Sequence, residues 1–156
     1  MIEVRRAAPA DAEELMTLRA VMFSAMNGRP VDTGEWRRAG AAMLRDLLAG
    51  DTMAAFVVDR EDAAGLAACA VGQVDRRLPG PGDPSGLRGY VYNVATLPAY
   101  RRRGFSRACM TALLEWYARL GIGTIDLRAS PEGEPLYRSL GFRHTSSPAM
   151  RLLTHS

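Results

Sequence analysis

The chain has 156 residues, of which 47% are hydrophobic and 24% are charged, so it is long enough to bury the core of one globular domain. This apolar content excludes disordered, collagen-like and fibrous proteins. All 20 basic residues are arginine and stand against 17 acids, and the formal net charge of +3 is too small to indicate nucleic-acid binding by itself.

Simple sequence patterns also limit the cellular location and the kinds of metal or disulfide site to be expected. No apolar run approaches the roughly 20 residues that a membrane span needs. The first residues include Glu3 and no apolar stretch, which is not the pattern of a secretory signal. Cys69 and Cys109 stand alone and are expected to be buried thiols in a reducing compartment, while His144 and His155 lack metal-ligand spacing. We therefore expect a cytoplasmic protein with no membrane partner and no metal site.

The first half of the chain alternates between patterns typical of strands and of helices. Asp11 followed by Glu14 resembles a capping box at the start of a helix, and Asp32 with Glu35 is expected to begin a second helix. Two strand-like segments follow, joined by a polar turn. In chain order we expect a strand, two helices and two strands, over residues 2–6, 11–28, 32–50, 53–59 and 66–74.

The second half begins with a surface loop rich in proline and glycine. An aromatic and β-branched segment then predicts a central strand, and apolar residues three or four apart predict a helix after it. Strands that alternate with helices indicate a mixed α/β sheet in a single domain spanning residues 1–156. In chain order we expect a loop, a strand, a helix, a strand, a short helix and one or two final strands, over residues 79–89, 90–96, 105–120, 124–127, 131–140 and from Phe142 onward.

The segment from Thr96 to Arg107 leaves the central strand, turns through three arginines and Gly104, and enters a helix. Such a turn presents unpaired backbone N–H groups at the positive end of the helix dipole, where arginines add charge-assisted contacts. The segment therefore indicates a phosphate site, with a solvated basic turn as the alternative. A GxxxxGK[ST] loop is excluded because the chain has no lysine, and GxGxxG is absent.

Two motifs in this half resemble the GNAT superfamily of acyl-CoA-dependent N-acetyltransferases. The first is Arg101-x-x-Gly104-x-Ser106, which follows the family's Gln/Arg-x-x-Gly-x-Gly/Ala except at the last position. The second runs from Leu136 to Phe142 and reads Leu-Tyr-Arg-Ser-Leu-Gly-Phe. The resemblance implies an α/β GNAT fold, whose mixed, mostly antiparallel sheet is flanked by helices on both faces and splays after the central strand.

The resemblance also implies which residues bind the cosubstrate, acetyl-CoA. The end of the central strand binds the pantetheine arm, and the loop after it holds the pyrophosphate. Ser106 adds a hydroxyl near the phosphates, and Ser130 stands where many relatives have an asparagine that contacts the cofactor. Tyr137 matches the family's tyrosine that faces the cofactor sulfur. The implied cofactor-binding residues are Val94, Ala95, Thr96, Arg101, Arg102, Arg103, Gly104, Phe105, Ser106, Arg107 and Ser130.

The implied reaction is N-acetylation of a small-molecule or peptide amine by direct attack in a ternary complex. Orientation lowers the barrier, and a backbone N–H near Val94 polarises the thioester carbonyl. Tyr137 is the catalytic acid, because a phenol is protonated at neutral pH. Relatives are often homodimers, so the resemblance also allows a homodimer.

Two other functions compete with this one. A non-catalytic acyl-CoA-binding regulatory module on the same fold would need no general base, and none is recognisable in the sequence. A nucleic-acid-binding domain would need a basic stripe with spaced aromatic residues, which is absent. For an enzyme, the base is open among Asp126, Glu35, a water held by Asn93 and a water chain to solvent.

The acceptor side carries less information. Phe23, Trp36, Tyr90 and Tyr92 have the spacing of core residues, and an acceptor pocket is the alternative role for them. In relatives the acceptor site is built from loops that correspond here to residues 26–31 and 145–148.

The positive charge is concentrated in one stretch. Residues 84–114 contain five arginines and no acid, which leaves 15 arginines against 17 acids elsewhere. We therefore expect one concentrated positive site, where the phosphates of CoA would bind. The five arginines are Arg88, Arg101, Arg102, Arg103 and Arg107.

Overall fold

The computed structural model describes residues 1–31 and 34–155. The strands and helices expected before Phe142 are present, although Asp32, the expected start of the second helix, lies outside the described residues. The elements in chain order are β1 (Arg5–Arg6), α1 (Ala12–Asn27), α2 (Glu35–Leu48), β2 (Met53–Asp59), β3 (Leu66–Arg76), β4 (Leu87–Thr96), α3 (Phe105–Arg119), β5 (Ile125–Leu127) and α4 (Glu134–Ser139), with 3-10 turns at Pro9–Asp11 and Pro98–Tyr100.

The strands of the described chain form one sheet in the order β1-β2-β3-β4-β5. Neighbouring strands run antiparallel except β4 and β5, which are parallel, so the expected mixed and mostly antiparallel sheet is confirmed. β5 pairs with β4 only between Gly89 and Val91. The rest of β4, from Tyr92 to Thr96, therefore separates from β5, which is the splay that the sequence predicted.

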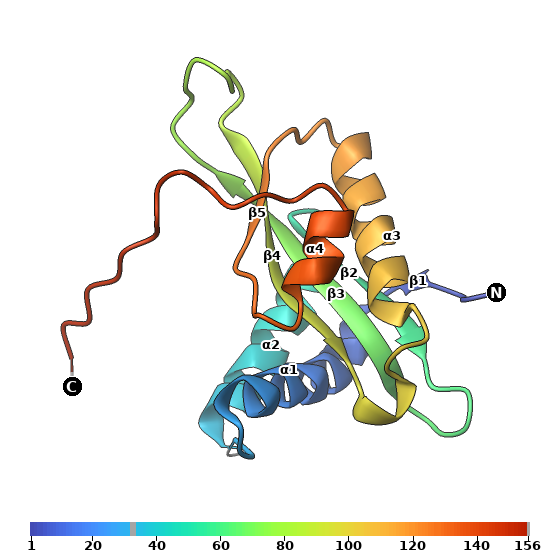
Figure 1. Ribbon diagram of the computed structural model, residues 1–156. Helices are drawn as coiled ribbons and strands as arrows, with labels where there is room; N and C mark the ends of the chain where they lie inside the picture. The colour runs from blue at the N-terminus through green and yellow to red at the C-terminus, as the bar shows by residue number, and fades with distance from the viewer. Residues whose placement is uncertain (32–33, 156) are drawn as a thin grey trace.

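Helices cover both faces of this sheet (Figure 1). On one face Leu15 of α1 packs with Val57 of β2, and α2 completes the layer. On the other face Met110 of α3 packs with Phe56, the neighbour of Val57, and Tyr137 of α4 lies against the same cluster. Because successive side chains of a strand point to opposite faces, β2 and β3 supply apolar residues to both cores and read as nearly continuous apolar runs.

Two glycines make room for a buried tyrosine that joins α3 to the sheet. A Cβ at Gly72 of β3 would collide with the Tyr117 hydroxyl, and one at Gly89 of β4 would lie 2.7 Å from its ring. The hydroxyl lies 2.8 Å from the carbonyl oxygen of Gln73 and 3.2 Å from that of Tyr90, and it donates to them. Tyr117 therefore fixes the first half of β4, immediately before the strand leaves β5.

Two expectations about the N-terminal segment are wrong. The first strand covers only Arg5–Arg6 instead of residues 2–6, and these two residues pair with Val57 and Phe56 of β2. Asp11 does not cap α1 through its side chain. Its carboxylate accepts hydrogen bonds from the Arg5 guanidinium at 2.9 Å and from the Ala8 N–H at 2.7 Å, since a charged partner binds a carboxylate more strongly than a helix amide does.

The expectation of one or two strands after Phe142 is also wrong for the described residues. Residues 143–155 contain no strand or helix, and the segment extends away from the body (Figure 1). Met150, Leu152 and Leu153 are 96%, 84% and 77% exposed. The physical reason lies in the sequence: Pro148 lacks an N–H for a ladder, and the apolar residues after it are few and do not alternate as in a half-buried strand.

Candidate active site

The second half of β4 is the centre of the candidate site. One edge of this segment pairs with β3, and the other faces the opening left by β5. Asn93 pairs with Val71 and Val91 pairs with Gly72, so Tyr92 is an extra residue in β4. A bulge of this kind bends the strand and redirects its side chains. Backbone groups beyond it that point to the open side have no strand partner and are available to a ligand.

The turn between β4 and α3 ends in a helix N-terminus suited to an anion. Gly104 is the N-cap residue with φ of +81°, and Arg102 has φ of +64°. A Cβ at Gly104 would meet only Ile2, at 3.5 Å, so the backbone conformation and not the available space favours glycine here. No side chain caps α3, and its first turn contains no acid. The first N–H groups of the helix are therefore available at the positive end of its dipole.

The end of β4 and the start of α3 form two walls of one cleft, of about 500 Å³, and α4 forms a third. We call this the cofactor cleft. Every cofactor-binding residue predicted from the sequence lines it except Arg103, and so does the predicted acid, Tyr137. The lining residues are Val94, Ala95, Thr96, Tyr100, Arg101, Arg102, Gly104, Phe105, Ser106, Arg107, Ser130, Glu132, Gly133, Leu136 and Tyr137.

The arginines of the cleft are held in different ways. Arg107 Nη2 donates to Ser139 Oγ of α4 at 2.7 Å, which joins α3 to α4 at the cleft. Arg101 Nε donates to the carbonyl oxygen of Thr96 at 3.2 Å. Arg102 lies at the left-handed position of the turn. These three arginines line the same cleft as the start of α3 with its free N–H groups, an arrangement that favours phosphate oxygens.

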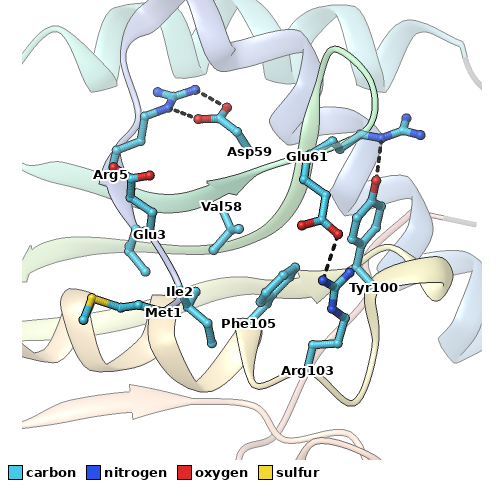
Figure 2. Close-up of a pocket in the computed structure, with 12 residues that line it drawn as sticks. Met1, Ile2, Glu3, Arg5, Val58, Asp59, Glu61, Tyr100, Arg103 and Phe105 are labelled. Atoms are coloured by element: carbon cyan, nitrogen blue, oxygen red, sulfur yellow. Dashed lines mark hydrogen bonds and ion pairs between the residues drawn. The ribbon is translucent and has the colours of Figure 1, made fainter.

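Arg103 points to the other side of the turn. Its Nη2 donates to Glu61 at 2.8 Å, and its guanidinium carbon lies 5.2 Å from the centre of the Phe105 ring. The Arg103–Glu61 pair lines a separate cavity of about 700 Å³, between the N-terminal segment, β2 and the start of α3. Figure 2 shows the pair among the other residues that line this cavity. Tyr100 and Phe105 line both cavities. In this arrangement the Arg103 side chain does not reach the cofactor cleft, because Glu61 and two aromatic rings hold it outside.

In the fold, nearby acids offset part of the positive charge of residues 84–114. Arg88 Nε lies 3.6 Å from Asp83 Oδ2, and its Nη1 lies 3.7 Å from Asp126 Oδ2. Arg88 does not line the cofactor cleft. Together with the Arg103–Glu61 pair, this leaves three of the five arginines at the cleft. The positive site is therefore smaller than the local charge of the sequence suggests, but it lies where the helix N-terminus is free.

Tyr137 occupies the junction between the cofactor cleft and its neighbouring pockets. Gly133 makes room for it, since a Cβ there would lie 2.9 Å from the Tyr137 ring. The ring packs edge-on against Phe142, with centroids 6.0 Å apart. Burial raises the pKa of Tyr137 above its ordinary value. The hydroxyl is therefore protonated near neutral pH, as a proton donor requires.

A second pocket, of about 580 Å³, adjoins the cleft and shares Val94, Ser130 and Tyr137 with it. We call it the acceptor pocket. Three of the four aromatic residues that the sequence left between core and pocket line it. Of the two loops expected near the acceptor, residues 26–31 contribute Met26, and residues 145–148 contribute nothing. The lining residues are Arg19, Met22, Phe23, Met26, Tyr90, Val91, Tyr92, Val94, Leu127, Arg128, Ala129, Ser130, Tyr137 and Arg151.

The fourth aromatic residue, Trp36, lines a smaller cavity of about 220 Å³ that shares Arg19 and Tyr92 with the acceptor pocket. Asn93 lies on the wall of this cavity and is 3% exposed. Its amide nitrogen donates to Cys69 Sγ at 3.4 Å, but its Oδ1 has no hydrogen-bond partner among the described residues. A buried carbonyl without a donor is uncommon, and a water or a ligand N–H in the cavity would satisfy it.

The three side chains considered for the general base lie in different surroundings. Asp126 is 3.7 Å from Arg88 and lines a separate pocket at the sheet edge. Glu35 pairs with Arg38 at 2.8 Å, and its side chain is 94% exposed. Asn93 faces the cavity next to the acceptor pocket. None of these three side chains lines the cofactor cleft or the acceptor pocket, so the general base stays a prediction.

The two serines of the cleft already have partners within the protein. Ser106 Oγ lies 2.6 Å from Thr96 Oγ1, so the hydroxyl that departs from the family pattern is bound to the end of β4. Ser130 Oγ accepts the Gly133 N–H at 3.1 Å and shapes the turn that precedes α4. This turn also explains why α4 begins at Glu134, three residues later than expected.

Three arginines of the acceptor pocket, Arg19, Arg128 and Arg151, were not predicted from the sequence. The position of Arg19 could have been predicted from the spacing of its apolar neighbours. Arg19 lies four residues after Leu15 and three before Met22, on the apolar stripe of α1. A cation at such a position faces the sheet instead of solvent. Arg128 and Arg151 are exposed residues outside helices and strands, and no pattern places them at a pocket.

Three further observations concern the predicted absences and the thiols. Among the residues that the structure describes, no helix is both long and apolar enough to span a membrane. Within residues 1–31 and 34–155, no three His, Cys, Asp or Glu side chains gather as they would around a metal ion. Cys69 and Cys109 are both buried and free, and burial raises the pKa of each thiol.

Comparison with known proteins gave one family match and many similar folds. Residues 14–142 match the acetyltransferase (GNAT) family. No curated protein matches the chain. Among solved structures, a predicted acetyltransferase with acetyl-CoA from Clostridium acetobutylicum is 22% identical, with a TM-score of 0.85 over 99% of each chain.

Two further structures have the same fold. A GCN5-related N-acetyltransferase from Ralstonia eutropha is 25% identical, with a TM-score of 0.78 over 97% of this chain and 99% of that one. A glucosamine-6-phosphate N-acetyltransferase from Arabidopsis thaliana is 14% identical, with a TM-score of 0.75 over 97% of this chain and 98% of that one. The likeness extends over nearly the whole length of the chain.

Proposed function

The chain belongs to the acetyltransferase (GNAT) family, and from this premise we propose that it transfers an acetyl group from acetyl-CoA to a primary amine in a ternary complex. One observation carries the proposal: the cofactor cleft joins the acceptor pocket at Val94, Ser130 and Tyr137. A donor and an acceptor that enter from these two sides would meet at the open part of β4. Orientation of this kind contributes about 7–11 kcal/mol in favourable cases.

The cleft fits acetyl-CoA by the chemistry of its walls. The uncapped start of α3, with Gly104 in the left-handed conformation, offers N–H groups to a pyrophosphate, and Arg102 and Arg107 offer charge. The end of β4 offers backbone groups to an amide-containing arm. When bound, acetyl-CoA supplies the acetyl thioester.

The protein's own groups then have separate tasks. A backbone N–H near Val94 polarises the thioester carbonyl. Tyr137 donates its proton to the departing sulfur. A water at Asn93 or in a chain to solvent takes the proton of the amine. Overall, an amine N–H bond and the thioester C–S bond break, while an amide C–N bond and a thiol S–H bond form.

The experiment that tests the proposal is a panel of primary amines with acetyl-CoA, in which released thiol is measured and isothermal titration gives the Kd of acetyl-CoA. We expect binding of acetyl-CoA and amine-dependent thiol release with at least one acceptor. Binding without thiol release for any amine would favour a non-catalytic acyl-CoA-binding module. Absence of binding would contradict the assignment of the cofactor cleft.

A further inference from the structure

Among the residues that the structure describes, every charged side chain that lines the acceptor pocket is positive. Arg19 of α1, Arg128 after β5 and Arg151 of the C-terminal segment line it, and no aspartate or glutamate of residues 1–31 or 34–155 does. The chain as a whole has 17 acids against 20 arginines, so a pocket with three arginines and no acid differs from the average of the molecule. A concave site lined by one sign of charge concentrates ligands of the opposite sign.

Arg19 is the most constrained of these three arginines. It is half-buried, and its guanidinium carbon lies 4.7 Å above the Phe23 ring. It takes part in none of the ion pairs within 4.0 Å that the described residues form, and burial lowers its pKa. A partly desolvated guanidinium without a carboxylate is unfavourable in the free protein, and an anionic group of a ligand would remove that penalty.

The neighbouring small cavity provides an independent observation. Arg19 and Tyr92 form part of its wall, and Asn93 presents a buried Oδ1 that accepts no hydrogen bond from the described part of the chain. Aliphatic, methionine and aromatic side chains form most of the remaining wall. The two unpaired groups are complementary to one kind of molecule, because an anion satisfies Arg19 and an N–H donor satisfies Asn93.

We propose that the acceptor is a primary amine that also carries a carboxylate or phosphate group, and that Arg19 selects it by binding this anion. The inference rests on the proposed acetyl transfer. The anionic end of the acceptor binds the Arg19 guanidinium, which fits carboxylate and phosphate oxygens in a bidentate manner. The amine end extends toward Val94 and Tyr137, the wall shared with the cofactor cleft, and the apolar part packs on Phe23.

The test compares matched pairs of amines that differ only in the anionic group. Isothermal titration with the full chain in the presence of CoA measures the Kd of phenylalanine against phenylalaninamide, and of methionine against methioninamide, for the carboxylate. O-phosphoethanolamine against ethanolamine is the phosphate arm. We expect the anionic member to bind about tenfold more tightly or better in at least one arm, and the arm that responds identifies the anion.

The variant Arg19→Met removes the charge and keeps an apolar side chain of similar length. We expect the preference within the responding pair to fall to about twofold or less, while Arg19→Lys retains part of it. The Kd of acetyl-CoA stays unchanged, since Arg19 does not line the cofactor cleft. Arg119→Met, at the end of α3 and away from the described pockets, is the matched control and keeps the full preference.

The outcomes separate this inference from the proposed function. Equal Kd values within every pair, or no binding of any anionic member, overturn the inference. A preference that survives Arg19→Met contradicts the role of Arg19. Thiol release that is faster with neutral amines contradicts the inference and leaves the acetyl transfer intact. Anion-dependent binding that Arg19→Met abolishes, without thiol release for any amine, supports the inference and contradicts the transfer.

Discussion

The cofactor cleft and the acceptor pocket meet at three residues, yet they are built in opposite ways. The cleft takes most of its walls from one continuous segment, the end of β4, the turn and the start of α3. The acceptor pocket combines residues of α1, β4, the loop after β5, α4 and the C-terminal segment. The cleft offers backbone N–H groups, whereas the pocket offers side chains.

This difference indicates how each region can vary. A site made of backbone groups depends on conformation and tolerates many side chains, so it suits a donor common to a whole family. A site made of side chains from distant segments changes with single substitutions. The acceptor therefore has to be inferred from this chain's own residues, such as Arg19 and Asn93.

The largest effect is expected at the junction of the two regions. Tyr137→Phe should lower kcat by about 100- to 10,000-fold if the hydroxyl is the proton donor. The Kd of acetyl-CoA and the KM of the amine should change little, because the ring remains in place. Stopped-flow or steady-state thiol release measures kcat, and isothermal titration measures Kd.

The pH profile tests the same residue independently. Burial raises the pKa of Tyr137, so the acid form persists above the usual phenol pKa of about 10. In the native protein, kcat should fall only above that pH, as the phenol loses its proton. Tyr137→Phe should lack this alkaline fall. A variant with unchanged kcat would show that Tyr137 only packs α4 against the sheet.

The second largest effect should be confined to the cofactor cleft. Gly104→Asp would place a carboxylate beside the phosphates at a backbone φ of +81°, and like charges at that distance should raise the Kd of acetyl-CoA by about 10- to 1000-fold. Gly104→Ala separates the backbone strain from the charge, since its Cβ would meet only Ile2, at 3.5 Å. Equal effects of the two substitutions would contradict the phosphate assignment. Binding of the amine should not change with either.

The same contrast explains how far the sequence alone could lead. Gly104 and Tyr137 could be assigned to one site from the sequence because both belong to short motifs that resemble those of the GNAT family, and both line the same cleft in the fold. The direction of the Arg103 side chain was not predictable, because three consecutive arginines carry no signal for which of them turns toward Glu61. That choice depends on the β2–β3 turn, which packs beside α3 only in the folded chain.

The fold shows the same division between local and distant information. The apolar runs of β2 and β3 and the helical spacing of α3 were sufficient to place these elements. Asp11 failed as a cap because Arg5 and Ala8 compete for its carboxylate, and the competition depends on the pairing of β1 with β2. The prediction of strands after Phe142 was wrong because it was based on only a few apolar residues.

A smaller effect is expected on the acceptor side. Asn93→Leu removes the unpaired Oδ1 and should raise the KM of the amine by about tenfold through loss of one hydrogen bond to an N–H group of the acceptor. The free energy of unfolding of the same variant should be about 1 kcal/mol higher than that of the native protein, because the variant no longer buries a polar group without a partner. Thermal denaturation and steady-state kinetics measure the two quantities. Lower stability with an unchanged KM would make Asn93 a structural residue.

The smallest effect is expected at the position where the chain departs from its family's motif. Ser106 stands in place of glycine or alanine, and its hydroxyl lies 2.6 Å from that of Thr96. Because this hydrogen bond already satisfies the hydroxyl within the protein, Ser106→Ala should change the Kd of acetyl-CoA by about threefold or less. Thr96→Val, which removes the partner, should free the Ser106 hydroxyl and serves as the matched variant. If Ser106→Ala weakened acetyl-CoA binding by tenfold or more, the hydroxyl would instead be a ligand of a phosphate. The cofactor cleft would then depend on a side chain, as the acceptor pocket does.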